Sequence, residues 1–181
     1  MSWIVTATNK KHDVFSLNVS DYCIEDIAWG LAAKGRFSGQ IKQMYPISRH
    51  CINVSYCVPQ AYALEALLHD ASEWVLGDMP RPVKHEFEDF QQLENFTDQN
   101  IRYKYNLPIG KCTNIVKHWD YTALITEAQF FGFDTSDWAK DLQAFKYCKK
   151  YAKLLEPWKR RDYYHVEREV SAFLKRFTEL H

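Results

Sequence analysis

Glycine and proline are scarce in this sequence, with six of each among 181 residues. Because tight turns between strands rely on these two residue types, their scarcity disfavours a turn-rich β-sandwich or barrel. Neither charge sign dominates, since Lys and Arg total 23 and Asp and Glu total 23. A protein that binds long nucleic acid, or a nuclease, needs a basic surface to neutralise phosphates, and this balance argues against both. A small anionic substrate needs only a few basic residues and stays compatible with the sequence.

Long apolar runs are also absent. No stretch approaches the ~18 consecutive apolar residues that cross a bilayer. The N-terminal residues MSWIVTATNKKHD lack the basic-then-apolar order of a secretion signal. The five cysteines are odd in number and contain no CxxC pair, which argues against a disulfide framework or a zinc ribbon. We therefore expect a cytoplasmic protein with free thiols that contacts no membrane.

Apolar residues are plentiful enough for a packed core. They make up 46% of the chain and include eleven Tyr, eleven Phe and six Trp. This content and the chain length predict one folded domain over residues 1–181. The β-prone residues 3–8, the turn-forming residues 9–13 and the apolar residues 14–17 predict a short N-terminal β-hairpin. The remaining periodicity is helical, so the predicted fold class is all-α, a helical bundle that follows this hairpin.

Capping residues and helix breakers set the expected helix boundaries. The expected helices span residues 24–34, 48–56, 60–76, 86–105, 111–131, 138–155 and 163–180. Ser48 is the expected N-cap of its helix, and Gly77 is expected to end the helix that starts after Pro59. The helix over 86–105 carries an apolar stripe that is predicted to be core, namely Phe87, Phe90, Leu93 and Phe96.

The stretch HDASEWVLGDMPRPVK, residues 69–84, concentrates the chemically useful side chains. His69 and Asp70 end an apolar run, which is an expensive environment unless a cation or a partner takes them up. Neutral imidazole and carboxylate are normal ligands of Zn, Mn or Fe, so the pair can bind one metal ion. On a continuous helix Glu73 shares their face, where it could orient a water or hold a second ion. The alternative is a helix end with a hydrogen-bonded histidine and solvated acids.

Two further candidate ligands lie on other expected helices. His50 and Asp120 each have apolar neighbours, although a single mid-helix Asp can equally face solvent. The order His50, His69-Asp70, Asp120 places four candidate ligands on successive helices, which could converge inside a bundle.

This order resembles that of the HD-domain metal-dependent phosphohydrolase superfamily, and the flanking residues sharpen the likeness. The stretch HDASEWVLGDMPRPVK is similar to the HDxxE…GDxPxPxK block of the bacterial HD-domain 5′-deoxynucleotidases. SRHCINVSY resembles the helix with their first metal histidine, and RFSGQ resembles the Arg-aromatic loop ahead of it. VKHWDYTALITEA resembles the helix with their last metal aspartate.

A closer resemblance is to the compact HD-domain proteins of phages and bacteria, some of which are dATP triphosphohydrolases. They share an N-terminal hairpin, an IEDIA helix, an RFGGH-like loop and a PW…FLxRF ending. In this chain the IEDIA helix corresponds to residues 23–28 and the RFGGH-like loop to residues 36–40. The PW…FLxRF ending corresponds to residues 156–158 and 173–177, so the likeness spans nearly the whole chain. This sequence departs at Ser38, where glycine is usual, and at Gln40, where histidine is usual. Both departures bear on base specificity rather than on the metal site.

The resemblance implies a role for each candidate residue. The implied ligands of one divalent ion (Zn, Co, Mn or Mg) are His50, His69, Asp70 and Asp120; the implied catalytic acids are Glu73 and Asp78; the implied substrate contacts are Arg36, Phe37, Ser38 and Lys84. A second ion could enter with the substrate phosphates. Arg36 and Lys84 suit phosphate oxygens, and Phe37 would lie under the deoxyribose and leave no room for a 2′-hydroxyl. Arg81 and His118 are weaker candidates.

The activity that the resemblance implies is hydrolysis of dATP to deoxyadenosine and triphosphate, which shapes the dNTP pool. The alternative within the class is a 5′-deoxynucleotidase that acts on deoxynucleoside monophosphates. A cyclic-nucleotide or (p)ppGpp hydrolase fits the flanking residues less well. A non-catalytic module that kept only the fold would be expected to lack some of these ligands. The resemblance also implies a homo-oligomer, a dimer or a hexamer.

Overall fold

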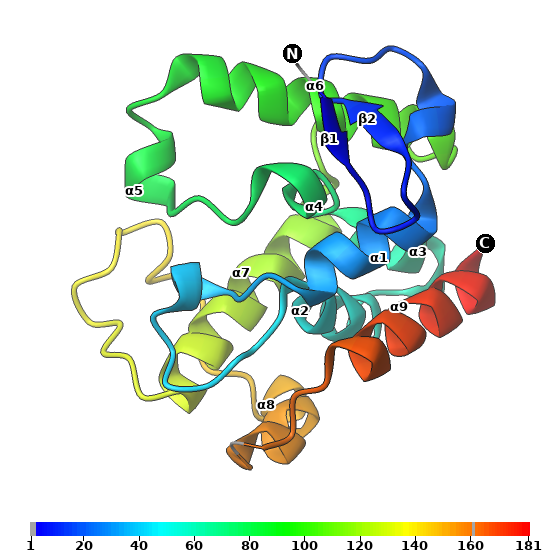
Figure 1. The fold of residues 1–181 in the computed structure, drawn as a ribbon. Coiled ribbons are helices and arrows are strands. Elements are labelled where there is room, and N and C mark those ends of the chain that lie inside the picture. The colour runs from blue at the N-terminus through cyan, green and yellow to red at the C-terminus, as the bar shows by residue number, and fades with distance from the viewer. Residues whose placement is uncertain (1–2, 161) are drawn as a thin grey trace.

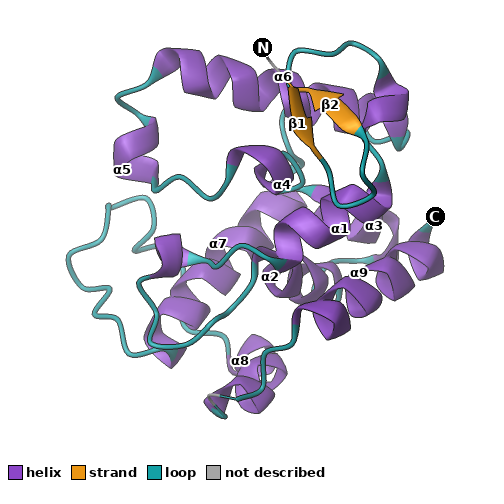
Figure 2. Cartoon of the chain, viewed as in Figure 1, coloured by secondary structure: helices purple, strands orange, loops and turns teal. Residues whose placement is uncertain are grey.

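The structure is a computed structural model that describes residues 3–160 and 162–181. Helices and irregular connections dominate, with one short hairpin near the N-terminus, which confirms the predicted all-α class (Figure 2). The α-helices are α1 (Ile24–Ala32), α2 (Ile47–Ser55), α3 (Ala63–Leu68), α4 (Glu73–Leu76), α5 (Arg81–Lys84), α6 (Glu88–Lys104), α7 (Asn114–Phe130), α8 (Lys149–Leu155) and α9 (Val166–Leu180). Short 3₁₀ helices are η1 (Val19–Asp21), η2 (Phe37–Gly39), η3 (Gln60–Tyr62) and η4 (Glu156–Lys159). Within the described ranges, no helix is long and apolar enough to cross a membrane.

The N-terminal hairpin pairs β1 (Trp3–Val5) with β2 (Lys11–Asp13) in antiparallel register. The prediction of a hairpin is confirmed, but the expected second strand at residues 14–17 is wrong. The chain reverses earlier because Asn9 adopts a positive φ of 59°, which asparagine tolerates better than most residues. The backbone N–H of Thr6 then donates to the carbonyl of Lys10 across the turn, at 2.9 Å.

Helix α2 forms the centre of the molecule. All of its residues except Arg49 are buried, as expected for a helix that is covered on every side. It contacts α1, α3, α7 and α9, and Figure 1 shows it in the middle of the ribbon. One apolar cluster joins it to α1, α3, α4 and α9, and a second joins it to α7 and α8. The side chain of His50 therefore lies in the interior.

The helix expected over residues 60–76 is broken into η3, α3 and α4 by a turn at 69–72. The Nδ1 atom of His69 donates to the carbonyl of Ala66 at 2.8 Å, the acceptor that a continuing α-helix would offer to the N–H of Asp70. Tighter i→i+3 bonds follow, such as Glu73 N–H to the Asp70 carbonyl at 3.0 Å. The predicted continuous helix is therefore wrong, because Glu73 begins a new helix after the turn. Asp70 and Glu73 nevertheless line the same cavity.

Helix α4 is held against α1 by an unusually close approach. An added Cβ on Gly30 would lie 2.4 Å from the carbonyl oxygen of Trp74, so only glycine fits at this crossing. The ammonium of Lys34 donates to the carbonyls of Glu73 and Trp74. These contacts fix the position of α4 and of Glu73 at its start.

Two predicted helix starts are wrong. Pro46, not Ser48, is the N-cap of α2, and Ser48 is a buried residue inside the helix. The helix expected over 138–155 begins only at Lys149. The side-chain amide of Gln143 donates to the carbonyls of Ser136 and Trp138, and these bonds stabilise a non-helical path. Residues 131–148 form an irregular segment, called here the wall segment.

The apolar stripe on α6 is not core. Phe87 is 56% exposed, and Phe90, Leu93 and Phe96 are only half-buried. The start of α6 lies beside α5, away from α2 (Figure 1). The other end of the helix reaches the core, where Ile101 is fully buried.

The close approach at Gly30 yields a stability prediction. Gly30→Ala should lower the free energy of unfolding by about 1–3 kcal/mol because the new methyl group overlaps the α4 backbone. Helix propensity alone would raise the free energy of unfolding by about 1 kcal/mol on replacing glycine with alanine, so a loss of stability can be attributed to the steric overlap. Urea unfolding followed by circular dichroism measures the change.

Gly35→Ala is the matched control. Its added Cβ would meet the flexible Met44 side chain, with Sδ at 3.2 Å, and this side chain can move aside. We expect a smaller loss than at Gly30. A Gly30→Ala protein as stable as the wild type would contradict the proposed role of the contact.

Candidate metal centre

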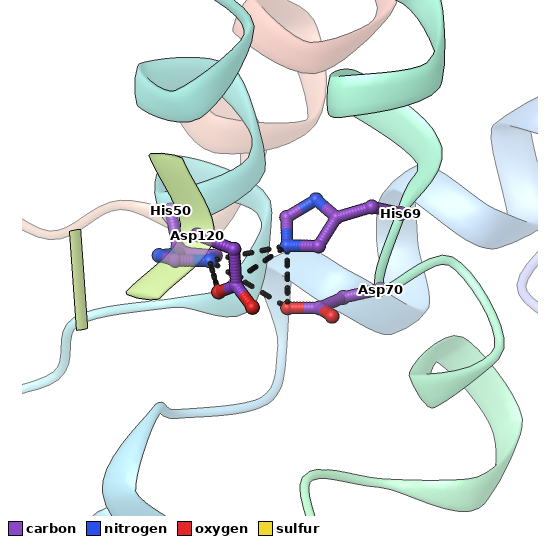
Figure 3. Close-up of side chains that lie close together, drawn as sticks. All are labelled: His50, His69, Asp70 and Asp120. Atoms are coloured by element: carbon purple, nitrogen blue, oxygen red, sulfur yellow. Dashed lines mark hydrogen bonds and ion pairs between the residues drawn. The ribbon is translucent and has the colours of Figure 1, made fainter. Parts of the chain in front are cut away.

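Four predicted ligands converge from three parts of the fold. His50 comes from the middle of α2, His69 and Asp70 from the turn after α3, and Asp120 from α7. Their potential ligand atoms all lie within 4.8 Å of one another. Figure 3 shows the four side chains pointing toward one another. The structure therefore brings together the set that the sequence order indicated.

The distances define a compact cluster of nitrogen and oxygen atoms. The Nε2 atoms of His50 and His69 are 3.3 Å apart. Oδ1 of Asp120 lies 3.2 Å from Nε2 of His50 and 3.6 Å from Nε2 of His69. Oδ2 of Asp70 lies 3.3 Å from Nε2 of His69 and 3.7 Å from Nε2 of His50.

Hydrogen bonds behind the rings orient both imidazoles. Nδ1 of His69 faces the carbonyl of Ala66, which can only accept, so this nitrogen carries a proton. Nδ1 of His50 likewise faces the carboxylate of Glu127, at 2.9 Å from Oε1. In the neutral rings both Nε2 atoms then carry lone pairs directed at the same point. Two such nitrogens with two carboxylates are a donor set that fits a divalent cation such as Zn, Co or Mn.

The charges of the cluster stabilise one another. Burial raises the pKa of Asp70, but the neighbouring His69 outweighs it and brings that pKa down to about 2. The pKa of Asp120 is also held well below its usual range, because hydrogen bonds from His50 and His69 outweigh its burial. Conversely, burial lowers the pKa of His69, but Asp70 and Asp120 outweigh it and raise that pKa well above the ordinary value. The site thus favours positive charge between the two rings.

A cavity of about 970 Å³ opens beside the cluster. This volume lies at the upper end of the range for small-molecule sites. Eight of the ten predicted site residues line it, namely Arg36, Phe37, Ser38, Asp70, Glu73, Asp78, Lys84 and Asp120. The predicted metal ligands and the predicted substrate contacts therefore belong to one site.

The loop that precedes α2 forms part of the cavity lining under backbone strain. Phe37, Ser38 and Gly39 all have a positive φ, of 56°, 50° and 73°. Only glycine adopts this region without cost, so two consecutive non-glycine residues store strain at the site. The ring of Phe37 packs on Phe133 with centroids 5.3 Å apart, and the hydroxyl of Ser38 donates to the carbonyl of Asp78 at 3.3 Å.

Both predicted phosphate-binding cations have carboxylate partners. Arg36 is 7% exposed, with Nη1 3.4 Å from Oδ2 of Asp70 and Nη2 3.3 Å from Oε2 of Glu127. Nζ of Lys84 lies 2.6 Å from Glu94. The two cations are therefore held in place at the cavity rather than free in solvent.

The two predicted catalytic acids differ in environment. Glu73 is buried, and its Oε2 has no hydrogen-bond partner among the described residues. Burial, with Asp70 and Asp78 nearby, raises the pKa of Glu73 well above its usual value. Asp78 lies in the connection between α4 and α5 and lines the cavity. Two carboxyl groups in different environments at one cavity are a pairing that can divide proton-transfer roles.

Sequence reasoning missed Glu127, which is fully buried on α7 and contacts His50 and Arg36. It lies seven residues after Asp120, two helical turns along the same face, and this spacing was the available signal. The wall segment was also missed as a lining element, although Phe133, Trp138 and Leu142 come from it.

The two weaker candidates lie outside the cluster. Arg81 lines the cavity mouth and pairs with Asp141 at 3.0 Å, with both side chains about half exposed. His118 is exposed and packs beside Phe145, with ring centroids 5.5 Å apart. Neither contributes an atom to the group of potential metal ligands.

Comparison with known proteins places the chain among relatives without a described activity. No family model matches it. It is 38% identical over 134 residues to an uncharacterized protein of Escherichia coli K12, YfdR, and the match covers 74% of this chain and 75% of YfdR. The chain belongs to the YfdR family. It is also 32% identical over 117 residues to an uncharacterized protein of Rhodobacter capsulatus, covering 59% of this chain and 60% of that protein.

The cluster predicts metal-dependent stability. A cation that binds the folded state at a hundred times its dissociation constant adds about 2.7 kcal/mol to the free energy of unfolding. Co²⁺ should therefore raise the melting temperature of chelator-treated protein. His69→Ala should abolish this shift because it removes one of the two nitrogens.

The exposed His118 provides the matched control, since His118→Ala removes a histidine outside the cluster. We expect this variant to keep the full Co²⁺ shift in differential scanning fluorimetry. An equal shift in His69→Ala and in the wild type would contradict the assignment of the cluster.

Proposed function

We propose that this member of the YfdR family is a metal-dependent deoxynucleotide phosphohydrolase of the HD-domain type. Its most specific form is a dATP triphosphohydrolase, which converts dATP and water to deoxyadenosine and triphosphate. The proposal is supported by one observation above all. The His/Asp cluster lies at a cavity that is also lined by two cations with carboxylate partners, Arg36 and Lys84, and by two further acids, Glu73 and Asp78. Aromatic side chains such as Phe37 line the same cavity.

The proposed chemistry is attack of water on the α-phosphorus with cleavage of its bond to the 5′-oxygen. A divalent ion held by His50, His69, Asp70 and Asp120 would lower the pKa of a bound water and polarise the phosphate. Glu73 is suited to accept the proton of the attacking water, because its buried Oε2 has no hydrogen-bond partner among the described residues and lies on the cavity beside Asp70. The 5′-oxygen leaves with this proton, which Glu73 returns directly or through Asp78.

Arg36 would orient the substrate phosphate. Its guanidinium is buried beside Asp70 and presents a rigid fork of N–H donors. Lys84 enters from α5 on the same cavity and supplies a compact positive charge. Both are held by carboxylates, so little side-chain freedom is lost when a phosphate binds.

The apolar part of the cavity lining would bind the nucleoside. Phe37 and Phe133 pack on each other, and Leu124, Trp138 and Leu142 extend the apolar lining. A purine base is flat and apolar on its faces, so it gains from such a surface. Phe37 and Arg36 are neighbours in the chain and line the same cavity. In the proposed complex the ring of Phe37 would lie beside the sugar of a nucleotide whose phosphate Arg36 holds.

The charge of the cavity lining supports a second candidate, a 5′-deoxynucleotidase. Five acidic side chains and three cationic ones line this cavity: Asp70, Glu73, Asp78, Asp120 and Asp137, with Arg36, Arg81 and Lys84. A divalent ion would offset part of this acidic excess. A triphosphate carries more negative charge than a monophosphate and would need further cations to accompany it. The dATP reaction is therefore expected to require free Mg²⁺ in addition to the ion in the cluster.

Product analysis tests the proposal. Metal-depleted protein is supplied with Co²⁺, Mn²⁺ or Zn²⁺, each with and without added Mg²⁺, or with Mg²⁺ alone. Each sample is given dATP, dGTP, ATP or dAMP, and the products are separated by anion exchange. We expect deoxyadenosine and intact triphosphate from dATP, and no turnover by His69→Ala. Phosphate from dAMP with dATP untouched would support the second candidate. No turnover of any substrate would overturn the proposed function.

Phe37 yields a specificity prediction. Phe37→Ala should lower the ratio of kcat/KM for dATP over ATP by at least about tenfold, because it removes the ring that leaves no room for a 2′-hydroxyl. Phe15→Ala, at an exposed phenylalanine in the N-terminal region, is the control and should leave the ratio unchanged. An unchanged ratio in Phe37→Ala would show that another residue excludes the ribose.

A further inference from the structure

Glu127 is the most heavily hydrogen-bonded carboxylate near the cluster. It is fully buried on α7 and accepts from Nδ1 of His50 at 2.9 Å. The hydroxyls of Tyr45 and Tyr151 donate to its Oε1 at 2.8 Å and 2.5 Å. Nη2 of Arg36 lies 3.3 Å from Oε2 of Glu127. One carboxylate therefore contacts a predicted metal ligand and the predicted phosphate-binding arginine at the same time.

The two tyrosines hold Glu127 in an acceptor role. The side-chain amide of Asn53 donates to the Tyr45 hydroxyl at 3.2 Å, so the hydrogen of that hydroxyl is directed to Glu127. Tyr151 reaches the site from α8 and is itself fully buried. Every group that touches Glu127 is thus a donor, and an ionised carboxylate is the only common side chain that can accept from all of them.

Glu127 also competes with Asp70 for Arg36. The guanidinium lies between the two carboxylates, 3.4 Å from Asp70 and 3.3 Å from Glu127. A buried guanidinium needs a charge partner. Without the charge of Glu127, Arg36 would pair more closely with Asp70 and draw that carboxylate away from the metal.

We propose that Glu127 is a positioning residue that links the metal centre to the phosphate-binding arginine. It fixes the His50 ring with Nε2 free to bind the ion, and it holds Arg36 so that Asp70 remains a ligand. The proposal rests on the proposed metal site and extends it to a residue outside the ligand set. Because His50 and Arg36 share one carboxylate, movement of either group alters the position of the other.

Metal affinity and the cobalt spectrum test this role without nucleotide. Metal-free wild type and Glu127→Gln are titrated with Co²⁺ by calorimetry, and the visible absorption of the bound Co²⁺ is recorded. We expect the variant to bind Co²⁺ about 10–100-fold more weakly. We also expect its absorption bands to shift, because the orientation of His50 and the availability of Asp70 both change. Wild-type affinity together with a wild-type spectrum would overturn the proposal.

Glu169→Gln is the matched control. Glu169 is as fully buried as Glu127 and pairs with an arginine of α2, Arg49, at 2.8 Å, but it touches none of the four ligands. This variant should lose stability and keep the wild-type Co²⁺ affinity and spectrum. Equal losses of affinity in Glu127→Gln and Glu169→Gln would reduce Glu127 to a general structural role and overturn the proposal.

Tyr151→Phe keeps the inference testable if Glu127→Gln does not fold. It removes one donor to Glu127 without changing any charge or touching His50 or Arg36. We expect a smaller loss of Co²⁺ affinity with a shifted spectrum, and an unchanged affinity and spectrum would overturn the proposal.

The failures of the two proposals are distinguishable. A wild type that binds Co²⁺ but hydrolyses no nucleotide overturns the proposed function and leaves the role of Glu127 intact. Normal hydrolysis with no Co²⁺ effect in Glu127→Gln and Tyr151→Phe overturns only the role of Glu127. A wild type that binds no Co²⁺ overturns the role of Glu127, and the product analysis with the other metals then decides the proposed function on its own.

Discussion

Mutual compensation of buried charge is the constraint on which the rest of the structure depends. Six ionisable side chains meet where α2, α7 and the turn after α3 come together: Arg36, His50, His69, Asp70, Asp120 and Glu127. Any of them alone would be costly to bury, and each is tolerated because its neighbours carry the opposite charge or donate a hydrogen bond. This requirement is met with α2 at the centre, covered on all sides, and with α3 ending where His69 turns toward the His/Asp cluster.

Much of the fold could be predicted from periodicity and breakers. Helices with a clear amphipathic pattern, such as α7 and α9, were located to within a few residues. Two of the failures arose where a side chain donates a hydrogen bond to a backbone carbonyl. The ring of His69 donates to the carbonyl of Ala66, and one expected helix is interrupted there. The side-chain amide of Gln143 donates to two carbonyls, and residues 138–148 do not join the helix expected to include them. Such bonds depend on local geometry that no apolar pattern encodes.

The candidate site was only partly accessible to the same reasoning. The four ligands were named from their order and from flanking residues that resemble a known superfamily, and their convergence is now seen in the structure. Glu127 was overlooked because a glutamate in the middle of a helix ordinarily faces solvent. Its burial becomes apparent only when Tyr45, from the connection before α2, and Tyr151, from a distant helix, are seen to donate to it.

The division of the cavity between two kinds of backbone has an evolutionary consequence. The metal ligands and Glu127 stand on packed helices or on the turn that joins them, where replacement disturbs the core. The surface proposed to face the base comes largely from the wall segment, which contains no regular helix or strand. Loops tolerate substitution and insertion better than packed elements. Under the proposed function, substitutions in the wall segment would change the nucleobase that is accepted, while the candidate metal ligands on the packed elements would stay the same.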